Sequence, residues 1–399
     1  MLPAVLKRFR SSMTPRLFII GLTLLTCYCA LMRAGTMPSK RDYYVAANGK
    51  DRNTGSQAHP WGTIGHADTI VKPGTTVHVA PGTYEAPNTK TNGTASARIR
   101  FVSDVRGGAQ LLSGWGVYGS YVDIVGFDIS NPGGWAAITA YNQTSHVRIE
   151  GNIIHDVSTT AGCVLAGAIS LNAVVNKGAP GGYHEIVGNL IRNIGPSDGS
   201  CNTDHAIYIK GGWNKIENNV IARVISWGVM IYGDGCYNTV SNNTVLNGNR
   251  GGIMISQAYD LHPDCALADH NTVSNNIVMN NGGAGIEEYS TQTGPNNVYL
   301  NNVVYNNGGG DIQLLTGTSS GTVTLTSAQA QNLFFNYQDD GTGDYGLAPG
   351  AAAVGVGTSI CTAGQSNCVP TVDFQVFSRT QLDAGAYAFG SVPAAWPWY

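Results

Sequence analysis

The stretch Lys215-Ile-Glu-Asn-Asn219-Val-Ile221 recurs, with variations, through the middle of the chain. Each copy has two or three alternating residues, a polar pair that ends in Asn, and a second alternating pair. The copies are Val147–Ile154, His184–Ile191, Lys215–Ile221, Thr239–Val245, Thr272–Val278 and Val298–Val304. Their final Asn residues lie 37, 30, 24, 33 and 26 positions apart. A constant core with insertions of variable length is typical of stacked coils whose loops differ in length.

A further apolar segment follows each copy after a loop. These segments are Ala137–Tyr141, Ala168–Asn172, Ala206–Lys210, Gly228–Tyr232, Gly252–Ser256 and Gly285–Tyr289. Each coil therefore has three strands, and the sequence predicts an all-β fold, a single-stranded right-handed parallel β-helix. The repeated Asn suits the tight turn between the first two strands, because Asn tolerates left-handed backbone angles and can hydrogen-bond to a stacked Asn. We expect these Asn residues to be structural.

The two ends of the chain are expected to differ from the coils. Residues 37–100 are predicted to form an N-terminal cap and first coil, residues 101–320 the coils, and residues 321–399 a C-terminal coil and cap. In the first region, Thr63–Val71 fits a short helix that Lys72-Pro73-Gly74 ends. Such a helix would cover the open end of the coils and prevent edge pairing. The segment Asp339–Asp344 is interpreted as a turn, because it lacks the ligand spacing of a calcium-binding EF-hand.

Composition agrees with one elongated, ordered domain. The chain has 399 residues, of which 52 are Gly, 43% are hydrophobic and 12% are charged. A solenoid can reach this length because each coil contacts only its neighbours. The net charge of −3 argues against a general nucleic-acid-binding protein. We expect a monomer.

The N-terminus is typical of an export signal. Lys7, Arg8, Arg10 and Arg16 precede an apolar run from Leu17 to Met32. The run is short for a membrane span of about 20 residues. We therefore predict that residues 1–36 are a signal peptide and that the protein is secreted, periplasmic or on the cell surface. An uncleaved signal anchor, which would tie the protein to a membrane, is the alternative, because no clean small-x-small cleavage site is present.

Six cysteines lie outside this N-terminal segment. An even number in an exported chain predicts disulfides. The coil register pairs Cys163 with Cys201 before the third strand and Cys236 with Cys265 after it, which leaves the local pair Cys361–Cys368. The first two disulfides would support loops on opposite sides of one sheet, so that the third strands form the floor of a groove.

Several motifs between Tyr43 and Phe389 resemble those of exported right-handed parallel β-helix proteins of the pectate-lyase-like group. They are Tyr43–Asp51, Pro73–Val77, Pro81–Tyr84, the Asn-Asn-x-Val coils and Asp383–Tyr387. The resemblance implies a polysaccharide partner that lies in a groove over one parallel sheet between long loops. It also implies calcium as a cofactor beside a Lys base. The dense Asp cluster that binds calcium in such lyases has no obvious counterpart in this sequence.

Alternation places two outward columns of side chains on the predicted floor. The first contains Thr139, Ser170, Tyr208, Met230, Met254 and Glu287, and the second contains Tyr141, Asn172, Lys210, Tyr232, Ser256 and Tyr289. Removal of the proton next to a carboxylate needs a base, an acid and a cation. We predict that Lys210 or His205 is the base of a polysaccharide lyase, that Tyr208 or Tyr232 is the acid, and that Arg250 binds the substrate carboxylate.

Other residues of this surface are predicted to bind substrate, and two other functions stay open. The binding residues are Tyr141, Asn172, Asp204, Asp234, Ser256, Glu287 and Tyr289. Glu287 and Asp234 could instead form the carboxylate pair of a glycoside hydrolase. Glu288 is predicted to point inward, where it needs a partner. The tyrosines could also be a sugar-stacking platform in a glycan-binding surface protein without catalytic activity.

Overall fold

The computed structural model describes residues 41–141, 144–160, 162–163, 167–172, 182–198, 201, 203–233, 235–256, 267–290 and 292–396. The predicted signal segment, residues 1–36, lies outside these residues. Within them, no helix is both long and apolar enough to cross a membrane.

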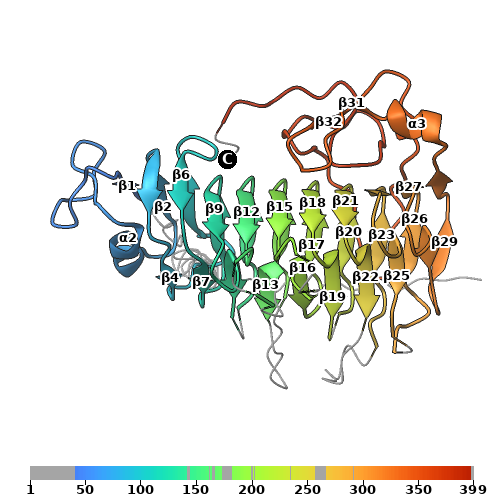
Figure 1. Cartoon of the computed structure of the whole chain (residues 1–399). Helices are drawn as coiled ribbons and strands as arrows, with labels where there is room; N and C mark the ends of the chain where they lie inside the picture. The colour runs from blue at the N-terminus through green and yellow to red at the C-terminus, as the bar shows by residue number, and fades with distance from the viewer. Residues whose placement is uncertain are drawn as a thin grey trace, which may run out of the picture. The chain divides into compact units, whose positions relative to one another are not determined.

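The coils stack into three long parallel sheets, which confirms the predicted all-β right-handed parallel β-helix (Figure 1). In the order met along one coil, the first sheet contains β1 (Arg41–Val45), β2 (Thr75–Val79), β5 (Ile99–Ser103), β8 (Val122–Val125), β11 (Arg148–Glu150), β14 (Glu185–Val187), β17 (Lys215–Glu217), β20 (Thr239–Ser241), β23 (Thr272–Ser274), β26 (Val298–Leu300) and β29 (Thr318–Ser320). The second sheet contains β3 (Gly82–Tyr84), β6 (Ala109–Leu111), β9 (Asp128–Asn131), β12 (Ile153–Val157), β15 (Leu190–Ile194), β18 (Val220–Val224), β21 (Thr244–Gly248), β24 (Ile277–Met279), β27 (Val303–Tyr305) and β30 (Val323–Thr324). The third sheet contains β4 (Asn88–Thr89), β7 (Trp115–Val117), β10 (Ile138–Ala140), β13 (Gly167–Asn172), β16 (His205–Lys210), β19 (Trp227–Tyr232), β22 (Gly251–Ser256), β25 (Ile286–Glu288) and β28 (Ile312–Gln313).

The turn between the first and second sheets combines a left-handed residue with a buried Asn. The left-handed position is taken by Gly151, Gly188, Asn218, Asn242, Asn275 and Asn301, with φ between 51° and 64°. The next residue in each coil is an Asn that is fully buried. Each amide bonds to the next, as where Asn189 Nδ2 donates to Asn219 Oδ1 (3.0 Å) and Asn219 Nδ2 donates to Asn243 Oδ1 (2.9 Å). The two properties expected of one Asn are therefore divided between two neighbouring residues.

A second ladder runs along the outside, between the third and first sheets. Six aromatic rings stack in order, with centroids 4.3, 5.1, 5.4, 5.4 and 4.6 Å apart. The rings belong to Tyr121, His146, Tyr183, Trp213, Tyr237 and His270, and all six residues have φ near 57°. Because each ring covers the face of its neighbour, this ladder holds the coils together and does not offer a free stacking surface for a ligand.

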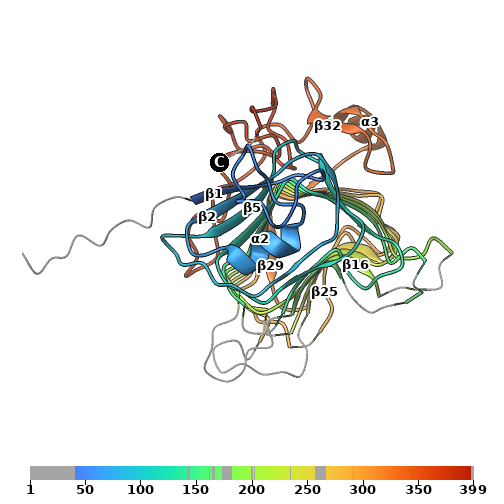
Figure 2. The same cartoon turned by 90° about the vertical axis from the view of Figure 1, so that its left-hand side faces the viewer.

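The N-terminal helix α2 (Ile64–Ile70) matches the predicted capping helix. It begins after Thr63, whose Oγ1 accepts a hydrogen bond from the His66 backbone N–H (3.1 Å). Figure 2 shows α2 in front of the first coils, and Ile64 and Ala67 are fully buried. The helix therefore shields the open end of the apolar interior.

The C-terminal region lies along the coils, which differs from the predicted end cap (Figure 1). After α3 (Ser327–Gln331), the antiparallel strands β31 (Phe334–Asn336) and β32 (Asp344–Leu347) pack on the outer face of the second sheet. That face is apolar in the later coils, through Val220, Ala222, Leu246, Ile277, Met279 and Val303. Packing against this apolar face removes it from water. This explains why the C-terminal region lies on the second sheet and does not cap the end of the β-helix.

The last residues then return toward the N-terminal coils along the left-handed asparagines. Asn301 Nδ2 donates to the Val356 carbonyl (2.7 Å), and Asn242 Nδ2 donates to the Asp383 carbonyl (2.8 Å). Trp396 Nε1 donates to the Ser103 carbonyl (2.8 Å). Between β31 and β32, the Thr342 N–H donates to Asp340 Oδ1 (2.9 Å), so Asp339–Asp344 contains the expected turn.

We predict that Asn219→Ala lowers the free energy of unfolding by about 2–4 kcal/mol, because it removes the buried acceptor of the Asn189 backbone N–H and the buried donor to the Ile186 carbonyl. Urea unfolding followed by circular dichroism would measure the loss. Asn336→Ala, at an exposed position of β31, is the control and should change stability by less than about 0.5 kcal/mol. Equal stability of the two variants would contradict the claim that the asparagine ladder stabilises the fold.

Candidate functional site

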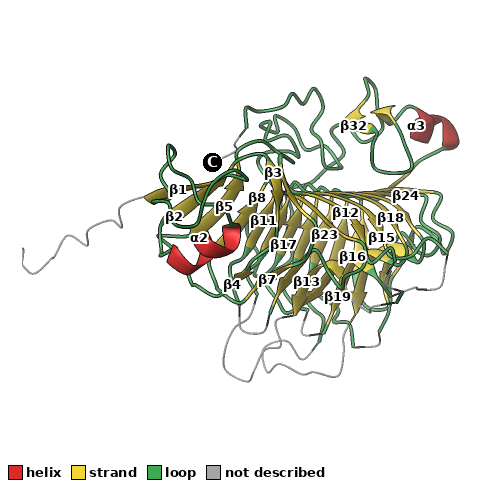
Figure 3. Ribbon diagram, turned by 60° about the vertical axis from the view of Figure 1, so that its left-hand side comes forward, coloured by secondary structure: helices red, strands yellow, loops and turns green. Residues whose placement is uncertain are grey.

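The outer face of the third sheet carries the two predicted columns of side chains. The register pairs Thr139 with Ser170, Ser170 with Tyr208, Tyr208 with Met230, Met230 with Met254, and Met254 with Glu287. In the second column Lys210 pairs with Asn172, and Tyr232 pairs with Ser256. The residues predicted to point inward, such as Ile207 and Val229, are fully buried. Figure 3 shows β13, β16 and β19 side by side in this sheet.

Disulfides support the loops beside this face. Cys163 and Cys201 are bonded to each other and join loops of consecutive coils, as predicted. The local pair Cys361–Cys368 is also confirmed. Cys236 is in a disulfide, and its predicted partner Cys265 lies outside the described residues. Disulfides of this kind indicate an oxidising compartment.

Lys210, Tyr208 and Tyr232 lie together in the middle of the floor. Lys210 and Tyr208 point outward from β16. The register pairs Ile209 with Ile231, so Tyr232 on β19 follows at the position next to Lys210. The rings of Tyr208 and Tyr232 are 6.4 Å apart, and all three side chains are half-buried. Within the described part of the chain, the Lys210 ammonium makes no hydrogen bond or ion pair. It is therefore accessible to a ligand in the groove.

His205 begins the same strand and is buried at the edge of the floor. Its ring lies 5.5 Å from that of Tyr208, and its Nδ1 accepts a hydrogen bond from the Trp227 backbone N–H (3.4 Å). Burial, together with the positive charge of Arg250, lowers the pKa of His205 to about 3. The imidazole is therefore neutral near pH 7, with its proton on Nε2. The preceding residue, Asp204, is also buried.

The two neighbouring glutamates of β25 have different surroundings. Glu287 points outward, where burial raises its pKa and the charge of Arg250 partly opposes that rise. Glu288 points inward, as predicted, and has the partners that an interior carboxylate needs. It accepts hydrogen bonds from the Leu315 and Thr316 backbone N–H groups (both 2.8 Å) and from the Tyr299 hydroxyl (2.9 Å). Glu288 is thus structural and takes no part in the groove.

Two features of the floor were not predicted. Trp227, Met254 and Ala284 form a buried apolar cluster on this outer face, with Met230 packed against it. Toward the N-terminal end, Tyr118 stacks on Tyr141 with centroids 4.3 Å apart, and Tyr118 is 46% exposed. The coil that contains Tyr118 lacks the Asn-centred repeat, so no register placed it beside Tyr141. Met230 and Met254, at equivalent positions of consecutive coils, are the sequence signal for this apolar cluster.

The remaining predicted residues vary in exposure. Tyr289 is exposed at the C-terminal end of the floor, whereas Ser256 is buried in the middle. Asp234 lies outside the described residues, and so does the side chain of Asn172. The hydrolase pair Glu287–Asp234 therefore stays a prediction.

The described residues do not form a calcium cage. Calcium takes six to eight oxygen ligands, usually from several carboxylates. The described floor contributes one outward carboxylate, Glu287. In the same part of the chain, the only cluster with metal-ligating side chains is Cys163, Cys201 and Asp204, and its two sulfur atoms are bonded to each other. A calcium requirement stays a prediction.

Comparison with known proteins agrees with this architecture. The sequence matches the family described as a right handed beta helix region over residues 136–328. By its fold, the chain is a right-handed parallel β-helix protein. A family of proteins of unknown function matches the N-terminal residues 47–93 of this β-helix protein. No curated protein matches its sequence.

Solved structures resemble the β-helix protein in fold, at low sequence identity. The pectate lyase Pel9A is 16% identical, with a TM-score of 0.54 over 89% of this chain and 98% of that chain. The complex of XylC with xylose is 14% identical, with a TM-score of 0.51 over 71% of this chain and 70% of that chain. A rhamnogalacturonan lyase is 12% identical, with a TM-score of 0.48 over 78% of this chain and 96% of that chain.

We predict that NMR titration of histidine-labelled protein will find His205 neutral down to about pH 4. Its pKa is lower in the folded state than the usual value of about 6.5 in an unfolded chain. Protonation therefore favours unfolding, and this part of the stability is lost as pH falls from 6.5 toward 3. His205→Gln should reduce the acid sensitivity of the unfolding free energy, while His59→Gln, in an exposed loop, should not. A His205 signal that titrates between pH 6 and 7 would contradict the burial of this ring.

Proposed function

We propose that the protein is an exported polysaccharide lyase that cleaves an acidic, uronate-containing glycan by β-elimination. The observation that carries the proposal is the unpaired Lys210 ammonium on the floor of a sheet face, beside Tyr208 and Tyr232. The similarity in fold to the lyase Pel9A adds less support than Lys210 does, because fold alone does not determine activity. The disulfides favour a secreted, periplasmic or cell-surface location.

In this mechanism a substrate chain lies along the floor with a uronate residue over Lys210. Lys210 Nζ first gives a proton to solvent and then takes the proton from the carbon next to the carboxylate. The released electron pair forms a carbon–carbon double bond, and the bond to the 4-linked sugar oxygen breaks. Tyr208 or Tyr232 gives that oxygen a proton. Arg250 neutralises the charge that develops on the carboxylate.

Lys210 is better suited to be the base than His205. The Nδ1 lone pair of His205 already accepts the Trp227 N–H, and Nε2 carries the proton. A conjugate acid with a pKa of about 3 is also a weak proton acceptor for a carbon acid. We assign His205 to holding the floor and donating from Nε2, and we assign proton abstraction to Lys210.

Arg250 is suited to bind the substrate carboxylate because its positive charge already affects ionisable groups of this floor. It begins the segment that enters β22, it is exposed, and its field affects both His205 and Glu287. A guanidinium can bind a carboxylate through two parallel hydrogen bonds. Asp204, Ser256 and the ring of Tyr141 are assigned to substrate binding along the same face, as are Asn172 and Tyr289.

A glycoside hydrolase is the second candidate, because Glu287 has a raised pKa. A half-buried carboxyl with a raised pKa is what a general acid needs. Its partner would be Asp234. A glycan-binding protein without catalytic activity would need only the aromatic floor, with Tyr118, Tyr141 and Tyr289.

We predict that the purified protein releases unsaturated uronates from at least one member of a panel of polyuronates, measured by ultraviolet absorbance with and without calcium. Lys210→Ala should lower kcat by about 10²-fold or more, because no other group replaces the base. Lys50→Ala, at an exposed position of the N-terminal cap, is the matched control and should keep full activity.

Other outcomes would separate the alternatives. New reducing ends without unsaturated product, lost in Glu287→Gln, would replace the lyase with the hydrolase. Binding of the polymer with neither product would leave a glycan-binding protein. Full activity of Lys210→Ala would contradict the assignment of the base.

A further inference from the structure

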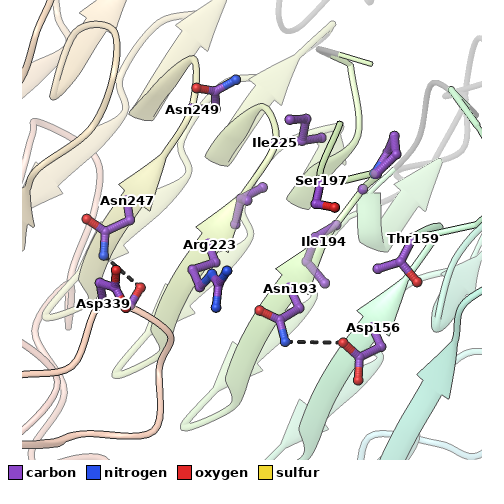
Figure 4. A pocket seen from close by; sticks show the side chains of 13 residues that line it. Asp156, Thr159, Asn193, Ile194, Ser197, Arg223, Ile225, Asn247, Asn249 and Asp339 are labelled. Carbon is purple, nitrogen blue, oxygen red and sulfur yellow. Dashed lines mark hydrogen bonds between the residues drawn. The ribbon is translucent and has the colours of Figure 1, made fainter. Parts of the chain in front are cut away.

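A pocket of about 520 Å³ lies at the ends of four successive strands of the second sheet (Figure 4). Its lining residues come from the ends of β12, β15, β18 and β21 and from the C-terminal segment, and they include Asp156, Asn193, Ser197, Arg223, Asn247 and Asp339. The volume is within the range of about 300–1,000 Å³ that small-molecule sites occupy. None of these residues belongs to the two columns on the third sheet.

Arg223 is unusual in its backbone position. The equivalent residues of successive coils are Asp156, Asn193, Arg223, Asn247, Asn280 and Asn306, all with φ between 51° and 58°. Asn and Asp are the side chains that tolerate this left-handed conformation best. Local backbone preference would therefore select Asn at position 223, and an Arg there needs another reason.

Arg223 also interrupts the hydrogen bonds of this column. Asn193 Nδ2 donates to Asp156 Oδ1 (3.1 Å), and Asn306 Nδ2 donates to Asn280 Oδ1 (2.9 Å). Asn247 Nδ2 turns to the Asp339 carbonyl (2.8 Å). In the described part of the chain the Arg223 guanidinium has no hydrogen bond or ion pair. Figure 4 shows it between Asn193 and Asn247.

The nearest acidic side chain of the column is already occupied. Asp156 Oδ2 is 2.7 Å from His155 Nδ1, and His155 Nε2 is 2.8 Å from Asp128 Oδ1. Hydrogen bonding to Asp128, against the cost of burial and with help from Asp156, raises the pKa of His155. The Asp156 carboxylate therefore has a partner of its own. The pKa of Asp340 is lowered mainly by hydrogen bonds from Thr342 and in part by the charges of Arg192 and Arg223, but Asp340 forms no ion pair with Arg223, whose donors are open to a ligand.

We propose that this pocket is a second saccharide-binding site, in which Arg223 binds the carboxylate of a uronate residue through two parallel hydrogen bonds. The guanidinium fork matches a carboxylate in geometry and charge. Asn193 and Ser197 can donate to and accept from the ring hydroxyls, and Asp339 can accept from them. Asn247 can only accept through Oδ1, because its Nδ2 already donates to the Tyr337 hydroxyl and the Asp339 carbonyl. The choice of a uronate rests on the proposed function, because that function supplies an acidic glycan.

The site would hold a distant stretch of the polymer that is cleaved in the groove. Gly195, Pro196 and Ser197 line the pocket, and the same loop continues to Cys201 and Asp204 at the edge of the third sheet. One loop thus borders both sites. Binding at the pocket would raise the local concentration of polymer at the groove without any new contact at the catalytic residues.

The direct test is NMR of the Arg223 guanidinium Nε–H signal in the full chain, assigned by its absence in Arg223→Asn. Lys210→Ala protein would be used so that the probe, trigalacturonate, is not consumed. We expect a saturable shift of the Arg223 signal. Calorimetry should then find binding at this site weakened by about tenfold or more in Arg223→Asn. Arg52→Gln, an exposed arginine of the N-terminal cap, should change nothing.

The variant Arg223→Asn separates binding from folding. Asn suits the left-handed position and could restore the column of amides, so we expect its melting temperature to be unchanged or higher. Weaker binding with undiminished stability supports a ligand role. A lower melting temperature with unchanged trigalacturonate binding would assign Arg223 to structure and overturn the proposal.

Two ligand controls and one activity control complete the design. An equal shift with the carboxyl-reduced trisaccharide, or with inorganic sulfate at the same concentration, would overturn recognition of a uronate. Saturable binding at Arg223 in a protein without lyase activity would reject the proposed function and keep this site. Lyase activity without any change in the Arg223 signal would keep the proposed function and reject this site.

Discussion

Hydrogen bonds between buried asparagine amides fix the height at which each coil stacks on the next. Each amide satisfies backbone groups of the tight turn and also bonds to the amide of the following coil, as at Asn189, Asn219 and Asn243. A shift of one residue in any coil would leave these polar groups buried without partners, at a cost of about 1–3 kcal/mol each. The register of all three sheets depends on this constraint.

Once the coils are in register, the position of a residue within its coil determines which side chains are its neighbours on the outer face. Residues far apart in sequence, such as Tyr208 and Met230, become neighbours on adjacent strands. The same rule brings Asp156, Asn193, Arg223 and Asn247 to one edge. The β-helix protein thus has polar side chains on the floor of the third sheet and, separately, at the ends of the second sheet. Ser197 lines the pocket, and Asp204, seven residues later in the chain, lies at the edge of the floor.

Much of this arrangement could be predicted from the sequence because the repeat is periodic. The period of Asn219 and its equivalents specified the coils, and alternation around Ile207 and Val229 specified which side chains point outward. Cys163 and Cys201 paired because their loops occupy the same place in consecutive coils. Each of these predictions needed only local geometry and the stacking of neighbours.

The remainder depended on contacts that have no period. The C-terminal segment lies on the second sheet because Val220, Leu246 and Ile277 are apolar on their outer face, a feature that a three-stranded coil does not require. The same segment brings Asp339 beside the turns, where it completes the lining of the pocket around Arg223. The sequence does contain one sign of this pocket, since Arg223 occupies a position where the other coils have Asn or Asp.

The central claim is that a uronate polymer binds over the third sheet with one residue at Lys210. A crystal structure of the Lys210→Ala protein with a uronate tetrasaccharide tests this claim most directly. We expect density for the sugar along β16 and β19, with a carboxylate near Arg250 and a glycosidic oxygen within hydrogen-bonding distance of Tyr208 or Tyr232. Sugar bound elsewhere with the third sheet empty would contradict it.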